Sequence, residues 1–393
     1  MRTTAPAGVG LMFATNGAAF ASLLPWYPTL KDQWQLSDAL FGLLVACFAA
    51  GSLLSTALPA WAERRFGPRA TVLAGTLVLA VAAAAVGVAP GAWAFAFILL
   101  VFGVFDAVVD VSQNVIGVRV QDALGRSILS SLHACWSLGA VVGSAAATWA
   151  ATSGVGVTTH LTVAAAVIAA AVVLAAWLVG PLPRPALAVG DPGNAAARRV
   201  PLTRILWLSL PVALVAGSGT VVEDVANNWA GLAAVSFAGV PLPQAGVALT
   251  VVLSAQMIGR FTGDMLINRF GRAVVARAGG LFIAAGGVFV IFAHESAPLY
   301  AGLALAGFGC ATLVPSAYAA AGTLPGLRPS DGVTAVSWLM RVGFLAASPV
   351  IGLIAEWSGL RVALGVLVVV GVAAALCAPA LRARGQELVG SKE

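Results

Sequence analysis

Long apolar runs, separated by short polar stretches, recur from one end of the chain to the other. A helix needs about 20 residues to cross a hydrocarbon core of about 30 Å, and each run is long enough. Barrel strands would instead appear as short alternating segments. We therefore predict an all-α integral membrane protein with twelve transmembrane helices, at 8–30, 38–61, 70–89, 92–117, 130–152, 159–180, 204–235, 244–267, 273–293, 298–322, 332–355 and 360–381.

Composition supports a membrane protein, because 60% of the 393 residues are hydrophobic and only 9% are charged. The net charge of +6 does not indicate nucleic acid, since the arginines lie between the apolar segments. All four cysteines fall inside apolar segments without a CxxC pair, so we expect reduced thiols, no metal site and no cofactor. The environment that we predict is a lipid bilayer, with the chain present as a monomer.

Positive charge is distributed unevenly between the two sets of connections. Seventeen of the 21 lysines and arginines fall in one set and in the tails, whereas the opposite set holds only Lys31 and Arg361. Because cytoplasmic connections carry the excess of basic residues, we predict a multi-pass protein of the bacterial inner membrane with both termini in the cytoplasm.

An internal repeat divides the chain into two units of six helices. A shift of 204 residues places Arg65-Phe66-Gly67 on Arg269-Phe270-Gly271, and Gly139 on Gly343. Between the units lies a stretch rich in proline and polar residues, which is typical of a linker. We predict an N-terminal half at 1–182, a cytoplasmic linker at 183–203 and a C-terminal half at 204–393, with a substrate site between the halves near the membrane midplane.

One connection carries a recognisable motif. The segment from Gly259 to Asp264, followed by 268–272, reads Gly-Arg-Phe-Thr-Gly-Asp and then Asn-Arg-Phe-Gly-Arg. It resembles the G-x-x-x-D-R-x-G-R loop signature of the major facilitator superfamily, with Asn268 at the position of the signature aspartate. The resemblance implies that fold and a transport function. It also implies a cytoplasmic gate, for which we predict Arg260, Asp264 and Arg269.

Three further segments, 105–114, 130–139 and 223–229, are similar to the fucose-permease-related branch that includes the YbjJ-like proteins. That branch carries carboxylates on its first and fourth helices. Here the match holds only at the fourth span, because the first span has Asn16, which cannot titrate. The resemblance therefore implies that a carboxylate of the fourth span acts with another partner.

Carboxylates inside apolar spans are the main candidates for proton coupling. Asp106 and Asp110 lie one helical turn apart, so both project from one face of the fourth span. Glu223 and Asp224 are adjacent in the seventh span, so we expect only one to face the cavity. Charged groups in a membrane are unfavourable and usually face a cavity or a partner, although structural pairs between helices or packing at an outer gate would also explain them.

Other polar and aromatic positions within the spans are candidates for binding a small polar substrate. Amides can hydrogen-bond a solute, and tryptophan or tyrosine can stack on a ring. Arg341 needs an acidic, carbonyl or aqueous partner, which could be an anionic substrate or a carboxylate at the interface of the halves. The predicted substrate-binding residues are Asn16, Gln113, Asn114, Trp136, Asn227, Asn228, Trp229, Gln256, Tyr318, Trp338 and Arg341.

These observations favour a secondary transporter that moves a small, polar solute by alternating access, coupled to protons. Efflux of drugs or metabolites by the same fold is an alternative, and a transport-derived sensor or a channel is the alternative class. We predict that the protein is not an enzyme, because the chain lacks GxSxG, HExxH and phosphate-loop motifs. Trp26 and Trp357 lie near the outer face and are predicted to anchor the spans at the interface.

Overall fold

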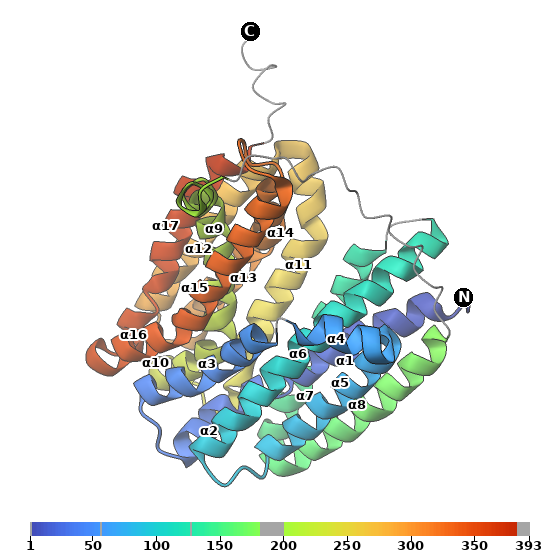
Figure 1. Cartoon of the computed structure of the whole chain (residues 1–393). Helices are drawn as coiled ribbons and strands as arrows, with labels where there is room; N and C mark the ends of the chain where they lie inside the picture. Colours follow the sequence, from blue (N-terminus) through green and yellow to red (C-terminus); the bar gives the residue numbers. More distant parts are fainter. Residues whose placement is uncertain (1, 56, 126–127, 181–199, 383–393) are drawn as a thin grey trace.

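The computed structural model describes residues 2–55, 57–125, 128–180 and 200–382, and within these ranges it contains helices but no strand. The predicted linker lies largely in 181–199, outside the described residues. Helices before this gap form the N-terminal half (Figure 1). They are α1 (Ala5–Ala21), η1 (Leu24–Trp26), α2 (Tyr27–Gln33), α3 (Asp38–Leu54), α4 (Leu58–Phe66), α5 (Pro68–Val86), α6 (Ala92–Leu124), α7 (Leu129–Thr152) and α8 (Val157–Val179).

Helices after the gap form the C-terminal half. They are α9 (Leu202–Asp224), the π-helical turn η3 (Val225–Trp229), α10 (Ala230–Phe237), η4 (Leu242–Gln244), α11 (Gly246–Phe270), α12 (Arg272–Phe292), α13 (Ser296–Cys310), α14 (Leu313–Ala321), α15 (Pro329–Ser358), α16 (Leu360–Ala363), α17 (Val366–Cys377) and η5 (Ala378–Leu381).

Among the described residues, eleven helical units are long and apolar enough to cross a membrane, and the pair α3 and α4, bent by 55°, makes a twelfth. Each predicted span coincides with one unit, which confirms the predicted fold class. The first unit includes a break at η1, where Pro25 and Pro28 cannot continue a regular helix. The spans therefore run in the predicted order, with irregular geometry in the first two.

The repeat is visible in the backbone of two turns. Gly67 ends α4 and precedes α5 with φ 81° and ψ 153°, and Gly271 joins α11 to α12 with φ 81° and ψ 154°. Before each glycine an arginine lies over the following phenylalanine ring, at 5.5 Å for Arg65 and 5.4 Å for Arg269. The offset of 204 residues thus corresponds to one local structure built twice.

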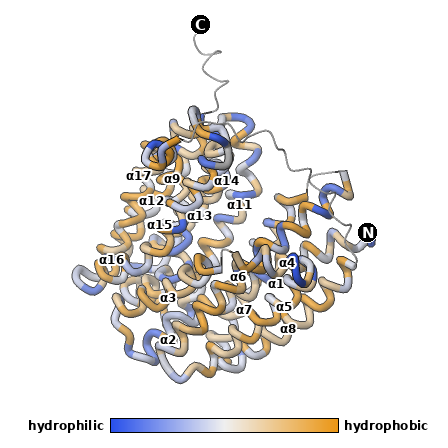
Figure 2. The backbone as a smooth tube through the Cα atoms, in the orientation of Figure 1, coloured by the Kyte–Doolittle hydropathy of each residue, from blue (hydrophilic) through white to orange (hydrophobic). Residues whose placement is uncertain are grey.

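The outer surface of the helices is apolar, as a lipid-facing surface must be. Figure 2 shows hydrophobic colour along most of the helices and hydrophilic colour mainly at their ends. Trp357 is exposed, as expected for an anchor. Trp26 is not an anchor, because the break at η1 turns it inward, where it is buried and donates a hydrogen bond to Nδ1 of His160 at 3.0 Å.

The main contacts between the halves gather at one end of the molecule, which we call the closed end and define by the start of α3 and the last turns of α15. There Gly42 packs directly on the carbonyl oxygen of Ser348, and Gly352 packs on that of Asp38. On the other side of the bundle, the hydroxyl groups of Ser144 and Thr250 lie 2.9 Å apart between α7 and α11.

The opposite end carries the two glycine turns at Gly67 and Gly271, and we call it the open end. The two halves lean apart toward this end in Figure 1. Gly139 and Gly343, which the repeat places at equivalent positions, differ in their packing. A methyl group at Gly139 would meet the backbone of α1 at Ala14, whereas one at Gly343 would meet nothing within 4 Å. The halves therefore share one architecture but do not have identical helix packing.

Candidate functional site

The first polar cluster lies within the N-terminal half and joins α1, α6 and α7. Asn16 donates from Nδ2 to Oδ1 of Asp106 at 2.9 Å, and Trp136 donates from Nε1 to Oδ1 of Asn16 at 2.8 Å. The backbones of α1 and α7 approach closely because Gly17 packs on the carbonyl of Trp136. Asn16 thus hydrogen-bonds the carboxylate of the fourth span, and the prediction that this carboxylate acts with another, titratable partner stays a prediction.

Asp110 lies one turn further along α6, toward the open end, and is exposed. Its carboxylate accepts hydrogen bonds from Gln113 at 3.4 Å and from Asn114 at 3.2 Å, both on its own helix. It also interacts electrostatically with His133 of α7 and with Arg341 of the other half. Asp110 therefore forms a polar cluster on α6 with Gln113, which is buried, and Asn114, which is partly exposed.

The second cluster crosses from the C-terminal half to the N-terminal half. Glu223 of α9 accepts hydrogen bonds from Gln256 at 2.6 Å and from Arg260 at 3.0 Å, both on α11. Arg260 donates its other terminal nitrogen to the hydroxyl of Ser137 on α7 at 3.1 Å. One guanidinium therefore joins a carboxylate of one half to a hydroxyl of the other.

The third cluster is buried beside the closed end, where α9 widens into the π-helical turn η3. Ser348 of α15 donates to Asp224 at 2.6 Å and accepts from Asn228 at 3.1 Å and from Trp229 at 3.0 Å. The fully buried indole of Trp229 packs at right angles on Phe41 of α3, with ring centroids 5.5 Å apart. Asp224 and Trp229 thus pack at the contact between the halves in this conformation.

Adjacent positions in the seventh span therefore have different surroundings. Glu223 is partly exposed and pairs with Arg260, while Asp224 is buried among hydroxyl, amide and indole donors. The difference follows from the turn of about 100° between neighbouring helical side chains. Both carboxylates have polar partners, which is how a charged group can be held inside an apolar protein.

The remaining predicted residues do not join these clusters through hydrogen bonds within the described part of the chain. Trp338 and Arg341 are both exposed on α15, about one turn apart. Asn227 in η3 and Tyr318 in α14 are partly buried. Among the predicted gate residues, Asp264 is exposed on α11, whereas Arg260 pairs with Glu223 and Arg269 lies over Phe270.

Sequence reasoning missed two hydroxyl groups that join helices within these clusters, Ser137 in the second and Ser348 in the third. Serine is common in transmembrane helices and often bonds only to its own backbone, so neither position is conspicuous. A weak signal existed, because Ser137 adjoins Trp136 and Ser348 precedes Pro349 within an apolar run. Within the described ranges, no group of histidine, cysteine, aspartate and glutamate side chains could hold a metal ion.

Two six-helix halves around polar clusters agree with a known protein family. The model of the Major Facilitator Superfamily matches residues 9–239 and 221–390, which is nearly the whole chain. The chain belongs to this superfamily. An uncharacterized MFS-type transporter of Yersinia pestis is 28% identical over 356 residues, a match that covers 90% of each chain. That relative is named as a transporter, which agrees with the prediction that this superfamily member is not an enzyme.

Solved structures show the same fold. The crystal structure of a D-xylose-proton symporter has a TM-score of 0.74 at 16% identity, and the match covers 96% of each chain. That of the transporter FucP in the outward conformation has a TM-score of 0.60 at 19% identity, covering 96% of this chain and 98% of FucP. Because identities this low show the fold alone, the resemblance to the fucose-permease-related branch stays a prediction.

Proposed function

We propose that this protein is a proton-coupled secondary transporter that moves a small polar solute across the bacterial inner membrane by alternating access. The observation that carries the proposal is the bridge from Glu223 through Arg260 to Ser137. In this bridge the guanidinium of Arg260 links a carboxylate of one half to a hydroxyl group of the other. A proton on that carboxylate can change how the halves are held together.

The chemistry of this bridge supports coupling. When Glu223 is charged, its ion pair holds the guanidinium of Arg260, which also donates to Ser137. When Glu223 accepts a proton, the ion pair is lost and Arg260 is free to bind another acceptor. Protonation of Glu223 would therefore release a donor that a solute can bind, so binding of the proton and binding of the solute would influence each other, as a coupled transporter requires.

A second carboxylate supports the same reading. Asp106 is held by Asn16, and Asn16 is in turn held by Trp136. This chain presents an amide, an indole and a carboxylate from three helices of one half, a set that can hydrogen-bond hydroxyl or amide groups of a solute. We therefore place solute binding between Asp106 and Glu223, with proton coupling at one or both carboxylates.

The orientation follows from the distribution of charge. With both termini in the cytoplasm, the basic turns at Arg65 and Arg269 face the cytoplasm, and the contact of Gly42 with Ser348 faces the outside. The described conformation is then the inward-facing one. The linker between the halves, in this arrangement, is cytoplasmic.

The test is transport by the purified protein in liposomes that contain a pH-sensitive dye. Pentoses and other small polar metabolites are added in turn, and the wild type is compared with Asp106→Asn, Asp110→Asn and Glu223→Gln. Glu63→Gln is the matched control, because Glu63 is a partly buried carboxylate that bonds to Ser112, outside the three clusters.

Solute-dependent proton movement that is lost in one of the three variants and kept in Glu63→Gln supports the proposal and identifies the coupling carboxylate. Solute flux without proton movement, unchanged in all variants, overturns coupling and leaves facilitated diffusion. Proton release from the vesicles that is driven by larger amphipathic compounds, with no response to polar solutes, favours the efflux alternative.

A further inference from the structure

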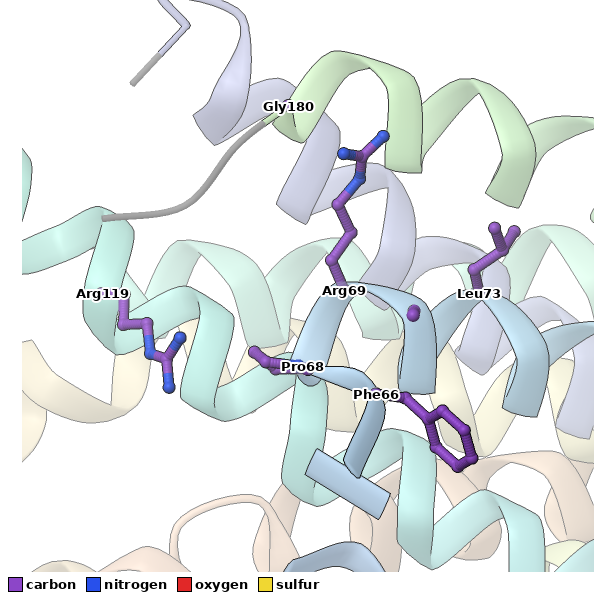
Figure 3. Close-up of a pocket in the computed structure, with 8 residues that line it drawn as sticks. Phe66, Pro68, Arg69, Leu73, Arg119 and Gly180 are labelled. Carbon is purple, nitrogen blue, oxygen red and sulfur yellow. The ribbon is translucent and has the colours of Figure 1, made fainter. Parts of the chain in front are cut away.

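A cavity of about 530 Å³ lies at the open end of the N-terminal half, separate from the three polar clusters. Its wall is formed by the turn between α4 and α5, the late part of α6 and the end of α8, as Figure 3 shows. The residues that matter for its chemistry are Phe66, Gly67, Pro68, Arg69, Arg119 and Gly180.

Two arginines give this cavity its charge. Arg69 comes from the first turn of α5 and Arg119 from the last two turns of α6. In Figure 3 the guanidinium of Arg69 extends toward Gly180, and that of Arg119 lies on the side of Pro68. Both side chains are half-buried, and neither has a hydrogen bond or ion pair within the described part of the chain. Both arginines thus contribute donors to the wall of the cavity, whose lining residues include no carboxylate, a combination that suits an anion.

The C-terminal half shows that the turn itself does not require these arginines. The repeat offset of 204 places Ala273 and Thr323 at the positions of Arg69 and Arg119. The turn at Gly271 nevertheless has the same backbone angles as the turn at Gly67. Positive charge at these two positions is thus specific to one copy of the repeated structure, and the backbone of the turn does not explain it.

The surroundings of the cavity place it at the boundary of the membrane. Phe66 lines the cavity and is exposed, and Trp61 and Trp177 are exposed nearby on the same end of the half. Arg2 lies over the Trp177 ring at 5.1 Å. Aromatic rings beside arginines are typical of the depth at which lipid headgroups lie. An anion that reaches this cavity from the membrane is therefore attached to an acyl chain.

We propose that this cavity binds the phosphate group of an anionic phospholipid between Arg69 and Arg119. A phosphodiester offers two acceptor oxygens that match the paired donors of a guanidinium. The acyl chains lie along the apolar faces of α4 and α8, beside Phe66 and Trp177. This site is independent of the proposed transport function, because it requires only that the protein resides in a membrane.

The experiment measures lipid binding by native mass spectrometry of the full-length protein in a neutral detergent. Phosphatidylglycerol and phosphatidylcholine are added separately over a range of concentrations. Each arginine beside an anionic headgroup contributes about 1 kcal/mol, so Arg69→Gln or Arg119→Gln weakens phosphatidylglycerol binding about fivefold, and both together about 25-fold. The matched control is Arg272→Gln with Arg277→Gln, which removes two charges from the same membrane face in the C-terminal half.

Loss of preference for phosphatidylglycerol in the cavity variants, with wild-type preference in the control, supports the proposal. If the double variant does not fold, the comparison is made with Arg69→Gln and Arg119→Gln separately. Equal losses in cavity and control variants mean diffuse electrostatic attraction and overturn it, as does unchanged binding. In a further arm, displacement of phosphatidylglycerol by inorganic phosphate at similar concentration would identify a site for a free anion and also overturn the lipid assignment.

Discussion

Alanine at Gly352 is the most direct test of the closed end. The new methyl group would lie 2.5 Å from the carbonyl oxygen of Asp38, and an ordinary contact of this kind is 3.4–4 Å. Because the obstacle is the backbone of α3, no side chain can rotate to make room. Helices α3 and α15 must therefore part by about 1 Å, and overpacking of this kind costs about 1–3 kcal/mol.

In the proposed transport cycle that energy acts on the equilibrium between two conformations, since α3 and α15 belong to different halves and would separate when the closed end opens. A penalty of about 1–3 kcal/mol on one state lowers its population relative to the other by about 5- to 150-fold. The assay is the distance between spin labels on Arg64→Cys and Asn268→Cys, which lie at the open end, after replacement of the four native cysteines. We expect the long distance to lose population to a shorter one.

Gly343→Ala is the matched control, because it makes the same chemical change on the same helix where nothing lies within 4 Å. It should leave the long distance populated as in the wild type. If Gly352→Ala and Gly343→Ala give the same distance distribution, the contact between α3 and α15 does not determine which end of the molecule is open.

Three further changes test other parts of the structure. Gly67→Ala and Gly271→Ala should each destabilise the protein by about 1–3 kcal/mol, and by similar amounts, because both glycines have φ near 81°; unequal losses in thermal unfolding would contradict their equivalence. Trp136→Phe keeps the ring but removes the N–H that holds Asn16, and should raise the KM for solute about fivefold in a flux assay. Ser348→Ala leaves buried polar groups unpaired and should lower stability by about 1–3 kcal/mol in chemical unfolding, whereas an unchanged midpoint would show that this hydroxyl is dispensable.

The number and order of the spans could be predicted because lipid imposes a simple requirement, a run of about 20 apolar residues for each crossing. The repeat could be predicted because a duplicated turn needs the same residues twice. Gly67 and Gly271 both adopt a backbone conformation that few other residues tolerate, so the match of Arg-Phe-Gly at a fixed offset reflected a real structural constraint.

The partners of the polar side chains could not be predicted, because they depend on how helices rotate and cross. Arg260 lies one turn from Asp264 in the sequence, yet it pairs with Glu223 on another helix and with Ser137 in the other half. Trp26 lies near a span end, as an anchor would, but a local break turns it into the core. The hydropathy of a span indicates where a residue lies between the two membrane surfaces. It does not identify the helix toward which the side chain of that residue points.

The contact of Gly42 and Gly352 with peptide carbonyls means that part of the contact between α3 and α15 is made of main chain. Peptide groups are the same whatever residue carries them, so this part of the contact has no chemical selectivity for a solute. The side chains that we propose to bind the solute are elsewhere, on α1, α6, α7, α9 and α11. Relatives with the same two glycines could thus acquire new solutes through substitutions on those helices while keeping this contact unchanged, which separates the evolution of specificity from that of the closed end.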